Sequence, residues 1–176
     1  MIVRMAELAD LNVCYDLDGS YVTEYVWQMQ AHENERSTEV RFDTVRLSRP
    51  MKVNYPRHPD ELLPSWRRGE CFLVAADDQG QAIAFLDMTA QMWHSTGWIQ
   101  NLIVHRRFRR RGVATALLRA ARHWALDNGL SKMMLETQTK NYPAIRFAQK
   151  HGFIFCGYND RYYSNGDIAL FFSLTL

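Results

Sequence analysis

The spacing of apolar residues changes several times along the chain, and these changes predict alternating strands and helices. Residues 2–17 fit a short strand passing into a helix. Residues 21–30 and 39–50 alternate in part and are rich in β-forming side chains, which predicts two strands around a polar segment. Residues 51–70 contain three prolines and predict a loop with one helical turn.

The rest of the chain carries sharper signals. Residues 71–93 predict a β-hairpin and residues 97–105 a further strand. After Gly112 a helix is expected to run to Asn128-Gly129, where glycine can take the left-handed conformation that ends a helix. Its predicted apolar face consists of Val113, Leu117, Ala120, Ala121 and Trp124.

Four elements follow in the last part of the chain. We expect a strand at 132–139, a helix at 143–152, and two strands at 153–163 and 167–176 joined by a turn at 164–167. The order predicts a single α/β (α+β) domain over residues 1–176, with one mixed sheet and helices packed on it.

Composition narrows the class of protein. The net charge is +2 and 47% of residues are hydrophobic, which is ordinary for a globular domain and weighs against a general nucleic-acid binder. Three widely spaced cysteines favour reduced thiols over a disulfide framework. No apolar run approaches the roughly 18 residues that span a bilayer. We therefore expect a cytoplasmic protein with no membrane partner.

One basic stretch, residues 105–118 (HRRFRRRGVATALL), indicates a binding site. Its five arginines lead through Gly112 into the predicted helix, directly after a predicted strand. A helix N-terminus has unpaired N–H groups and a partial positive charge, so a phosphate can bind there. The glycine patterns of a P-loop and of a dinucleotide fold are absent. The alternatives from this stretch alone are a solvated basic loop and a nucleic-acid contact.

The segment from Arg109 to Ala114 resembles the R/Q-x-x-G-x-G/A signature of the GCN5-related N-acetyltransferases, the GNAT superfamily. A second block, residues 135–153 (LETQTKNYPAIRFAQKHGF), is also similar, and its start resembles the streptothricin acetyltransferase branch. The resemblance covers about residues 70–176. It implies a mostly antiparallel twisted sheet whose splayed central strands hold acetyl-CoA, with residues 1–65 on the acceptor side.

The resemblance also implies a set of cofactor-binding residues. The pantetheine arm would lie along the strand at residues 102–104, and the pyrophosphate would meet the turn and helix start at 109–115. The implied residues are Leu102, Ile103, Val104, Arg109, Arg110, Arg111, Gly112, Val113, Ala114, Thr115, Asn141, Phe147 and Lys150. No metal is implied.

Acetyl transfer to an amine needs proton removal from the amine, stabilisation of the thioester oxygen and departure of a thiolate. For the base we favour Glu136, where related enzymes place a glutamate; the alternative is a glutamate that faces solvent or pairs with an arginine. Asp87, Gln100 and Asn101 could instead hold a water or attract the amine. Ala148 stands where many relatives have a tyrosine acid, so that role is open among Tyr142, Tyr158, Tyr162 and Tyr163.

The acceptor and the assembly are less defined by the sequence. Acidic side chains before residue 45 suit a polycationic amine, but arginines among them dilute the argument. Small-molecule amines, antibiotics and protein or peptide amines all stay open. So do an acetyl-CoA-binding sensor with little turnover and a homodimer formed through an exposed terminal strand.

Overall fold

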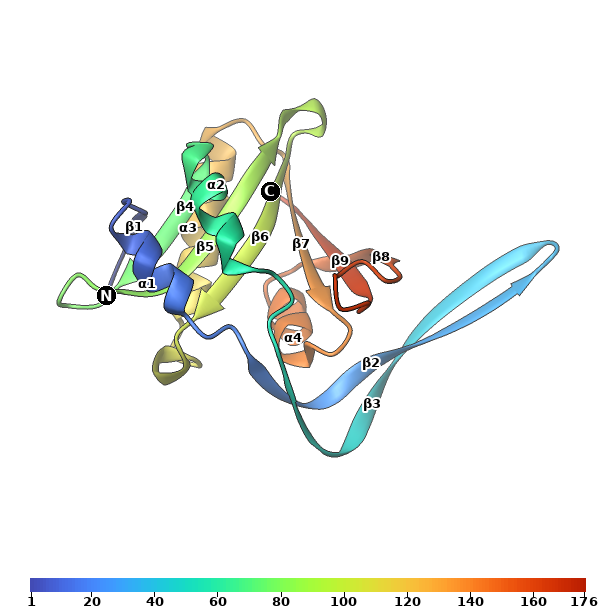
Figure 1. Ribbon diagram of the computed structural model, residues 1–176. Helices are drawn as coiled ribbons and strands as arrows, with labels where there is room; N and C mark the ends of the chain where they lie inside the picture. The colour runs from blue at the N-terminus through green and yellow to red at the C-terminus, as the bar shows by residue number, and fades with distance from the viewer.

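The computed structural model describes all residues 1–176 (Figure 1). Its helices are α1 (Asp10–Asp16), α2 (Leu62–Arg67), α3 (Val113–Asp127) and α4 (Tyr142–Lys150), with short 3-10 turns at Pro59–Glu61, Met92–His94 and Arg106–Phe108. Its strands are β1 (Ile2–Met5), β2 (Tyr21–Asn34), β3 (Ser37–Val53), β4 (Cys71–Ala76), β5 (Ala82–Gln91), β6 (Thr96–Val104), β7 (Lys132–Gln138), β8 (Ile154–Asn159) and β9 (Ala169–Thr175).

Seven strands form one mixed sheet in the order β1-β4-β5-β6-β7-β9-β8. Every neighbouring pair is antiparallel except β6 and β7, which run parallel. The larger core lies between the sheet and helices α3 and α4, and a smaller core lies between the sheet and helices α1 and α2. The predicted α/β class and the mostly antiparallel sheet flanked by helices are confirmed.

Helix α3 forms where the apolar spacing predicts it. Val113, Leu117 and Ala121 are buried in the larger core, and Ala120 and Trp124 pack against its edge. The helix ends at Asp127 with Asn128 as its C-cap, and Gly129 follows with a φ of 74°, a conformation that glycine adopts without strain. Because α3 crosses β4, β5 and β6, its N-terminus is fixed beside the end of β6.

The two strands predicted in the first third form a long hairpin, β2 and β3, separate from the main sheet. Figure 1 shows its far end projecting well beyond the body of the molecule. About halfway along the hairpin, Trp27 donates its backbone N–H to the Thr139 carbonyl and packs against Phe155 and Phe172. The pairing continues through the segment predicted as polar, from Ala31 opposite Val40 to Asn34 opposite Ser37, so the two strands are longer than predicted.

Two expectations about the C-terminal strands need correction. The final strand, β9, is not exposed: it lies between β7 and β8, so the edges of the sheet are β1 and β8. The connection between β8 and β9 is also longer than a tight turn, because β8 ends at Asn159 and β9 begins at Ala169. The Asn165-Gly166 turn is present, but it lies inside this longer loop.

Candidate functional site

The parallel strands β6 and β7 separate partway along their length. Their pairing runs from Thr96 opposite Lys132 to Ile99 opposite Leu135 and then stops. On its other side β6 stays paired with β5 as far as Val104, with an irregularity that leaves Gln100 without a partner. Figure 1 shows the two strands diverging beyond this point. The backbone of Leu102–Val104 therefore presents an unpaired edge to which an extended molecule can bind.

The separated strands lead to an anion-binding turn. Gly112 has a φ of 83° and precedes the first residue of α3, and Arg110 is also left-handed, with a φ of 62°. The first N–H groups of α3 have no partners within the helix, and its first turn holds no acidic side chain. A Cβ added at Gly112 would meet nothing within 4 Å, so the turn opens onto free space.

The three arginines of this turn have different roles. Arg109 donates three hydrogen bonds to backbone carbonyls: 2.9 Å to Val104, 2.7 Å to Ser20 and 2.7 Å to Asp18. Its guanidinium is thus occupied in holding the segment after α1 against the end of β6, and burial lowers its pKa. Arg110 and Arg111 are exposed, so their side chains are the ones free to meet a phosphate.

Helix α4 brings a second set of predicted residues to the same opening. The Asn141 side-chain oxygen accepts the N–H of Ala144 at 3.1 Å and caps the helix, which leaves its amide N–H groups for another partner. Phe147 packs at the edge of the core, and Lys150 is exposed. His151 Nε2 lies 3.2 Å from Thr115 Oγ1, so a polar contact links α4 to the first turn of α3.

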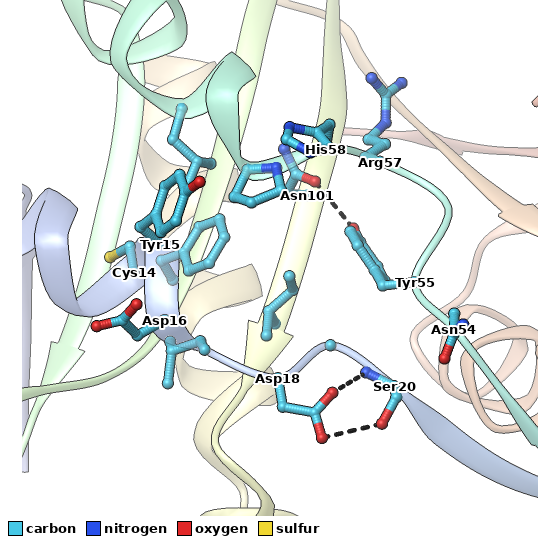
Figure 2. A pocket seen from close by; sticks show the side chains of 16 residues that line it. Cys14, Tyr15, Asp16, Asp18, Ser20, Asn54, Tyr55, Arg57, His58 and Asn101 are labelled. Carbon is cyan, nitrogen blue, oxygen red and sulfur yellow. Dashed lines mark hydrogen bonds between the residues drawn. The ribbon is translucent and has the colours of Figure 1, made fainter. Parts of the chain in front are cut away.

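A pocket of about 360 Å³ lies on the opposite face of the sheet, between α1, the loop after β3, and strands β5 and β6. Figure 2 shows Tyr55 reaching from that loop to Asn101 on β6, with a hydrogen bond of 3.0 Å from its hydroxyl to Asn101 Oδ1. Asp16 and Asp18 line the pocket from the α1 side. Hydrogen bonds from Ser20 lower the pKa of Asp18.

Glu136 on β7 is enclosed by three hydrogen-bond donors. Its side chain is 1% exposed, and Arg57 Nη2 lies 2.5 Å from one carboxylate oxygen. The other oxygen accepts Trp98 Nε1 at 3.1 Å and the Tyr162 hydroxyl at 2.9 Å. Burial alone would lower the pKa of Arg57, but the charge and hydrogen bond of Glu136 raise it. Glu136 therefore lies at the opening between the strands, paired with an arginine as the alternative interpretation anticipated.

The two side chains assigned to the acceptor lie outside the pocket wall. Asp87 is 1% exposed and accepts the Ser65 hydroxyl at 2.6 Å, while its other oxygen has no partner. Burial raises the pKa of Asp87, despite the hydrogen bond from Ser65 and the opposing effect of the neighbouring Asn101 amide. Gln100 instead donates to Thr89 Oγ1 at 3.3 Å. Of these three polar side chains of β5 and β6, Asn101 is the one that lines the pocket.

The tyrosines differ in their distance from Glu136. The Tyr162 hydroxyl donates a hydrogen bond to Glu136. Tyr163 lies nearby, and its pKa is raised first by burial and then by the charge of Glu136. Tyr142 packs on Tyr25 and Tyr158 on Phe42, away from the carboxylate. Ala148, at the position of the usual tyrosine, is fully buried in the core.

Sequence reasoning missed Tyr55 and Arg57. Both belong to the proline-rich loop between β3 and α2, in the part of the chain where no family pattern was recognised. The signal that could have found them is an aromatic and a basic side chain placed among prolines in an otherwise polar loop, since rigid loops often carry functional side chains.

Comparisons with known proteins agree with this geometry. The model of the Acetyltransferase (GNAT) family matches residues 38–153. Streptothricin acetyltransferase of Streptomyces lavendulae is 30% identical over 180 residues, covering 97% of this chain and 93% of that protein. Other curated relatives are matched over only about half of their own length, at 48% and 49%.

Solved structures share the whole fold. Nourseothricin acetyltransferase superposes with a TM-score of 0.83 at 25% identity, covering 99% of this chain and 97% of that one. A Bacillus anthracis protein solved in complex with acetyl coenzyme A gives a TM-score of 0.79 at 21% identity, covering 99% and 98%. The second likeness is one of fold alone.

Proposed function

This chain belongs to the GNAT acetyltransferase family, an enzyme family that takes its acetyl group from acetyl-CoA, and we propose that its acceptor is a primary amine on a polycationic small molecule. The observation that carries the proposal is the pocket lined by Asp16 and Asp18, which meets the separated strands at Asn101. Carboxylates there would attract a cationic acceptor and hold its second positive charge away from the reacting amine.

The residues present fit acetyl-CoA. The free N–H groups from Val113 to Thr115 and the exposed Arg110 and Arg111 would hold the pyrophosphate. The unpaired edge at Leu102–Val104 would take the pantetheine amides, and Asn141, Phe147 and Lys150 would line the α4 side. When bound, the cofactor supplies an acetyl thioester. Arg109 would act through the backbone that it supports, not through its side chain.

Glu136 stays the proposed base, with a condition that the contacts add. A carboxylate surrounded by three donors must release one of them before it can accept the proton of an ammonium ion. Tyr162 is the most readily displaced, because it is 40% exposed, whereas Arg57 is 18% exposed and forms the shorter contact. An arriving ammonium group would replace the Tyr162 hydroxyl and place its proton against Glu136.

The streptothricin acetyltransferases among the relatives support a small polycationic antibiotic as the acceptor type. The size of the pocket supports the same class, because about 360 Å³ falls within the range of small-molecule sites. A protein N-terminus carries one ammonium group on an extended chain, so it would pair with only one of the Asp16 and Asp18 carboxylates. A polycation can pair with both.

The experiment that tests the acceptor is a comparison of thiol release from acetyl-CoA with four amines at equal concentration. The amines are a streptothricin, spermidine, lysine amide and a peptide with a free N-terminus. We expect the streptothricin to give the highest kcat/KM and the peptide the lowest. Asp18→Asn should reduce kcat/KM for the polycation about tenfold and leave lysine amide nearly unchanged. A peptide preferred by the wild-type enzyme would overturn the acceptor proposal.

The proposal includes a homodimer formed through the open edge of the sheet. On strand β8, Ile154 is 73% exposed and Phe155 is 37% exposed, which is unusual for apolar side chains on an edge strand. Light scattering tests the dimer: we expect the mass of two chains for the wild type and of one chain for Ile154→Lys.

None of the helices has both the length and the apolar character that crossing a membrane requires. We place the enzyme in the cytoplasm, with no nucleic-acid partner.

A further inference from the structure

Tyr55 reaches the point at which strands β6 and β7 have just separated. The last residues paired between these strands are Ile99 and Leu135. Asn101, two residues further along β6, accepts the Tyr55 hydroxyl at 3.0 Å. The backbone of the next residue, Leu102, also lies beside the Tyr55 oxygen, since it acts to lower the pKa of Tyr55. The hydroxyl therefore lies at the narrow end of the opening.

Several neighbours hold the ring and the hydroxyl in place. A Cβ at Gly19 would lie 2.8 Å from Tyr55 Cγ, so the ring packs directly on the Gly19 backbone. Asn101 lies opposite Asp87 in the pairing of β6 with β5, and the Asp87 carboxylate is fixed by the Ser65 hydroxyl at 2.6 Å. The Asn101 oxygen faces Tyr55 and accepts the one hydrogen of its hydroxyl.

The proposed cofactor placement brings the thioester to the same point. The pyrophosphate lies at Gly112, at one end of the opening, and the pantetheine arm follows β6 backwards from Val104 to Leu102. The thioester at the end of this arm then lies level with Asn101. We propose that Tyr55 is a catalytic residue whose hydroxyl, beside the Leu102 N–H, turns its single hydrogen from Asn101 Oδ1 to the thioester carbonyl oxygen as negative charge develops there.

This inference rests on that cofactor placement and gives Tyr55 a role different from the acid missing at Ala148. Burial, and then the charge of Asp87, raise the pKa of Tyr55 and outweigh the opposite effects of Arg57 and Leu102. The hydroxyl thus keeps its proton at neutral pH. It is suited to donating a hydrogen bond and poorly suited to giving its proton to a thiolate, whose conjugate thiol has a pKa of about 8.5.

The step balances with Tyr55 unchanged. The amine nitrogen forms a bond to the carbonyl carbon, and the electron pair moves to the oxygen between Tyr55 and Leu102. The carbon–sulfur bond breaks as the carbonyl forms again, and CoA leaves as a thiolate that takes a proton from water. The ammonium group loses one proton to the base or to water before attack, and the bonded nitrogen loses a second proton to water afterwards.

The test is Tyr55→Phe, which removes only the hydroxyl. We expect kcat to fall about 100-fold, the loss typical of one donor to such an oxygen, with the Kd for acetyl-CoA within twofold of wild type by calorimetry. The slow hydrolysis of acetyl-CoA without an acceptor should fall by a similar factor, so the result does not depend on the acceptor. Tyr21→Phe is the matched control: its hydroxyl also makes a buried bond, 2.8 Å to Gln138, but lies outside the pocket wall, and its rate should be retained.

A second variant separates a chemical role from a structural one. Difluorotyrosine at position 55 keeps the shape of the side chain and lowers the pKa of the phenol. We expect activity near wild type below that pKa and a new loss of kcat above it, because the ionised phenol cannot donate. A rate for Tyr55→Phe within threefold of wild type, with normal acetyl-CoA binding, would overturn the proposal. Loss of acetyl-CoA binding in this variant would also overturn it, because it would place the hydroxyl in cofactor binding.

Discussion

Arg57 and Glu136 are 79 residues apart in the sequence, yet Arg57 Nη2 lies 2.5 Å from Glu136 Oε1. The contact joins the loop after β3 to β7 across the opening between the central strands. It closes the acceptor side of the opening and buries the carboxylate almost completely. The loop after β3 is therefore held to β7 by this ion pair, on the same carboxylate that accepts Trp98 of β6.

The ion pair allows the base role of Glu136 to be tested against a purely structural one. If Glu136 is the base, Glu136→Gln should lower kcat about 100-fold at pH 7, with most of the rate recovered near pH 10, where the amine loses its proton unaided. Its Kd for acetyl-CoA should change far less. Arg57→Met is the control. Equal losses in both variants, unchanged by pH, would show that Glu136 acts only as an anchor.

The Gly112 turn predicts a selective loss of cofactor binding. In Gly112→Val a side chain enters the space proposed for the pyrophosphate, so the thermal shift caused by acetyl-CoA should vanish. In the wild type, ligand at about 100 times its Kd adds roughly 2.7 kcal/mol of stability. Gly80→Val is the matched control, because Gly80 also has a positive φ, 82°, and open space around it. Both variants should lose about 1–2 kcal/mol from backbone strain.

Arg109 and Arg111 should differ in what their removal affects. Arg109→Met deletes three hydrogen bonds to carbonyls, and we expect it to lower the free energy of unfolding by about 2–3 kcal/mol. Because two of these carbonyls belong to the pocket wall, the KM for the acceptor should rise more than the Kd for acetyl-CoA. Arg111→Met should show the reverse, weaker acetyl-CoA binding with stability within about 0.5 kcal/mol of wild type. Urea unfolding and calorimetry measure both quantities.

A buried ion pair in the N-terminal part predicts a pH dependence of stability. Burial acts to raise the pKa of Asp10, but hydrogen bonds from Arg4 and the Glu7 N–H lower it below the ordinary value of an aspartate. A lowered folded-state pKa adds stability above the unfolded pKa, and that stability is lost as the pH falls through the folded pKa. Asp10→Asn should therefore cost about 1–3 kcal/mol between pH 5 and 8. The difference from wild type should shrink steadily below about pH 4. Asp16→Asn, an exposed change on the same helix, should show no such trend in urea unfolding.

Gly19 offers a way to displace Tyr55 without altering its hydroxyl. An added methyl group would lie 2.8 Å from Tyr55 Cγ and 3.1 Å from Ile103 Cδ1, so the ring has to shift. We expect Gly19→Ala to lower kcat at least tenfold while acetyl-CoA affinity is kept. Gly157→Ala, where nothing lies within 4 Å of the new methyl group, is the control. A full rate in Gly19→Ala would mean that the position of the ring is not critical.

The sequence alone was sufficient for the features that depend on local order. The strand, the arginine turn and helix α3 follow one another within a short stretch, and each is specified by its own spacing and by Gly112. Helix α4 follows the same logic, whereas the capping role of Asn141 was seen only in the structure. These features make up most of the proposed cofactor site, which is why its fold was predictable.

The acceptor side of the site depends on contacts between residues that are far apart in the sequence. The spacing of apolar and polar residues along the chain does not predict such contacts. Tyr55 meets Asn101 from 46 positions away, and Tyr21 meets Gln138 from 117. The arginine signature marked Arg109 for the cofactor, but its side chain bonds to carbonyls 89 and 91 positions earlier. The signature predicts the backbone turn well. It does not predict which arginine side chains of the turn bond to other parts of the fold.

The division between these two regions has a consequence for how such an enzyme can change. Most of the pocket wall comes from residues before Cys71, whereas the turn and strand edge proposed for the cofactor all come after it. Genetic recombination near that boundary would replace most of the pocket wall and keep the residues proposed to bind acetyl-CoA. Recombination there would change the acceptor in a single event, while the residues proposed to hold acetyl-CoA stay as they are.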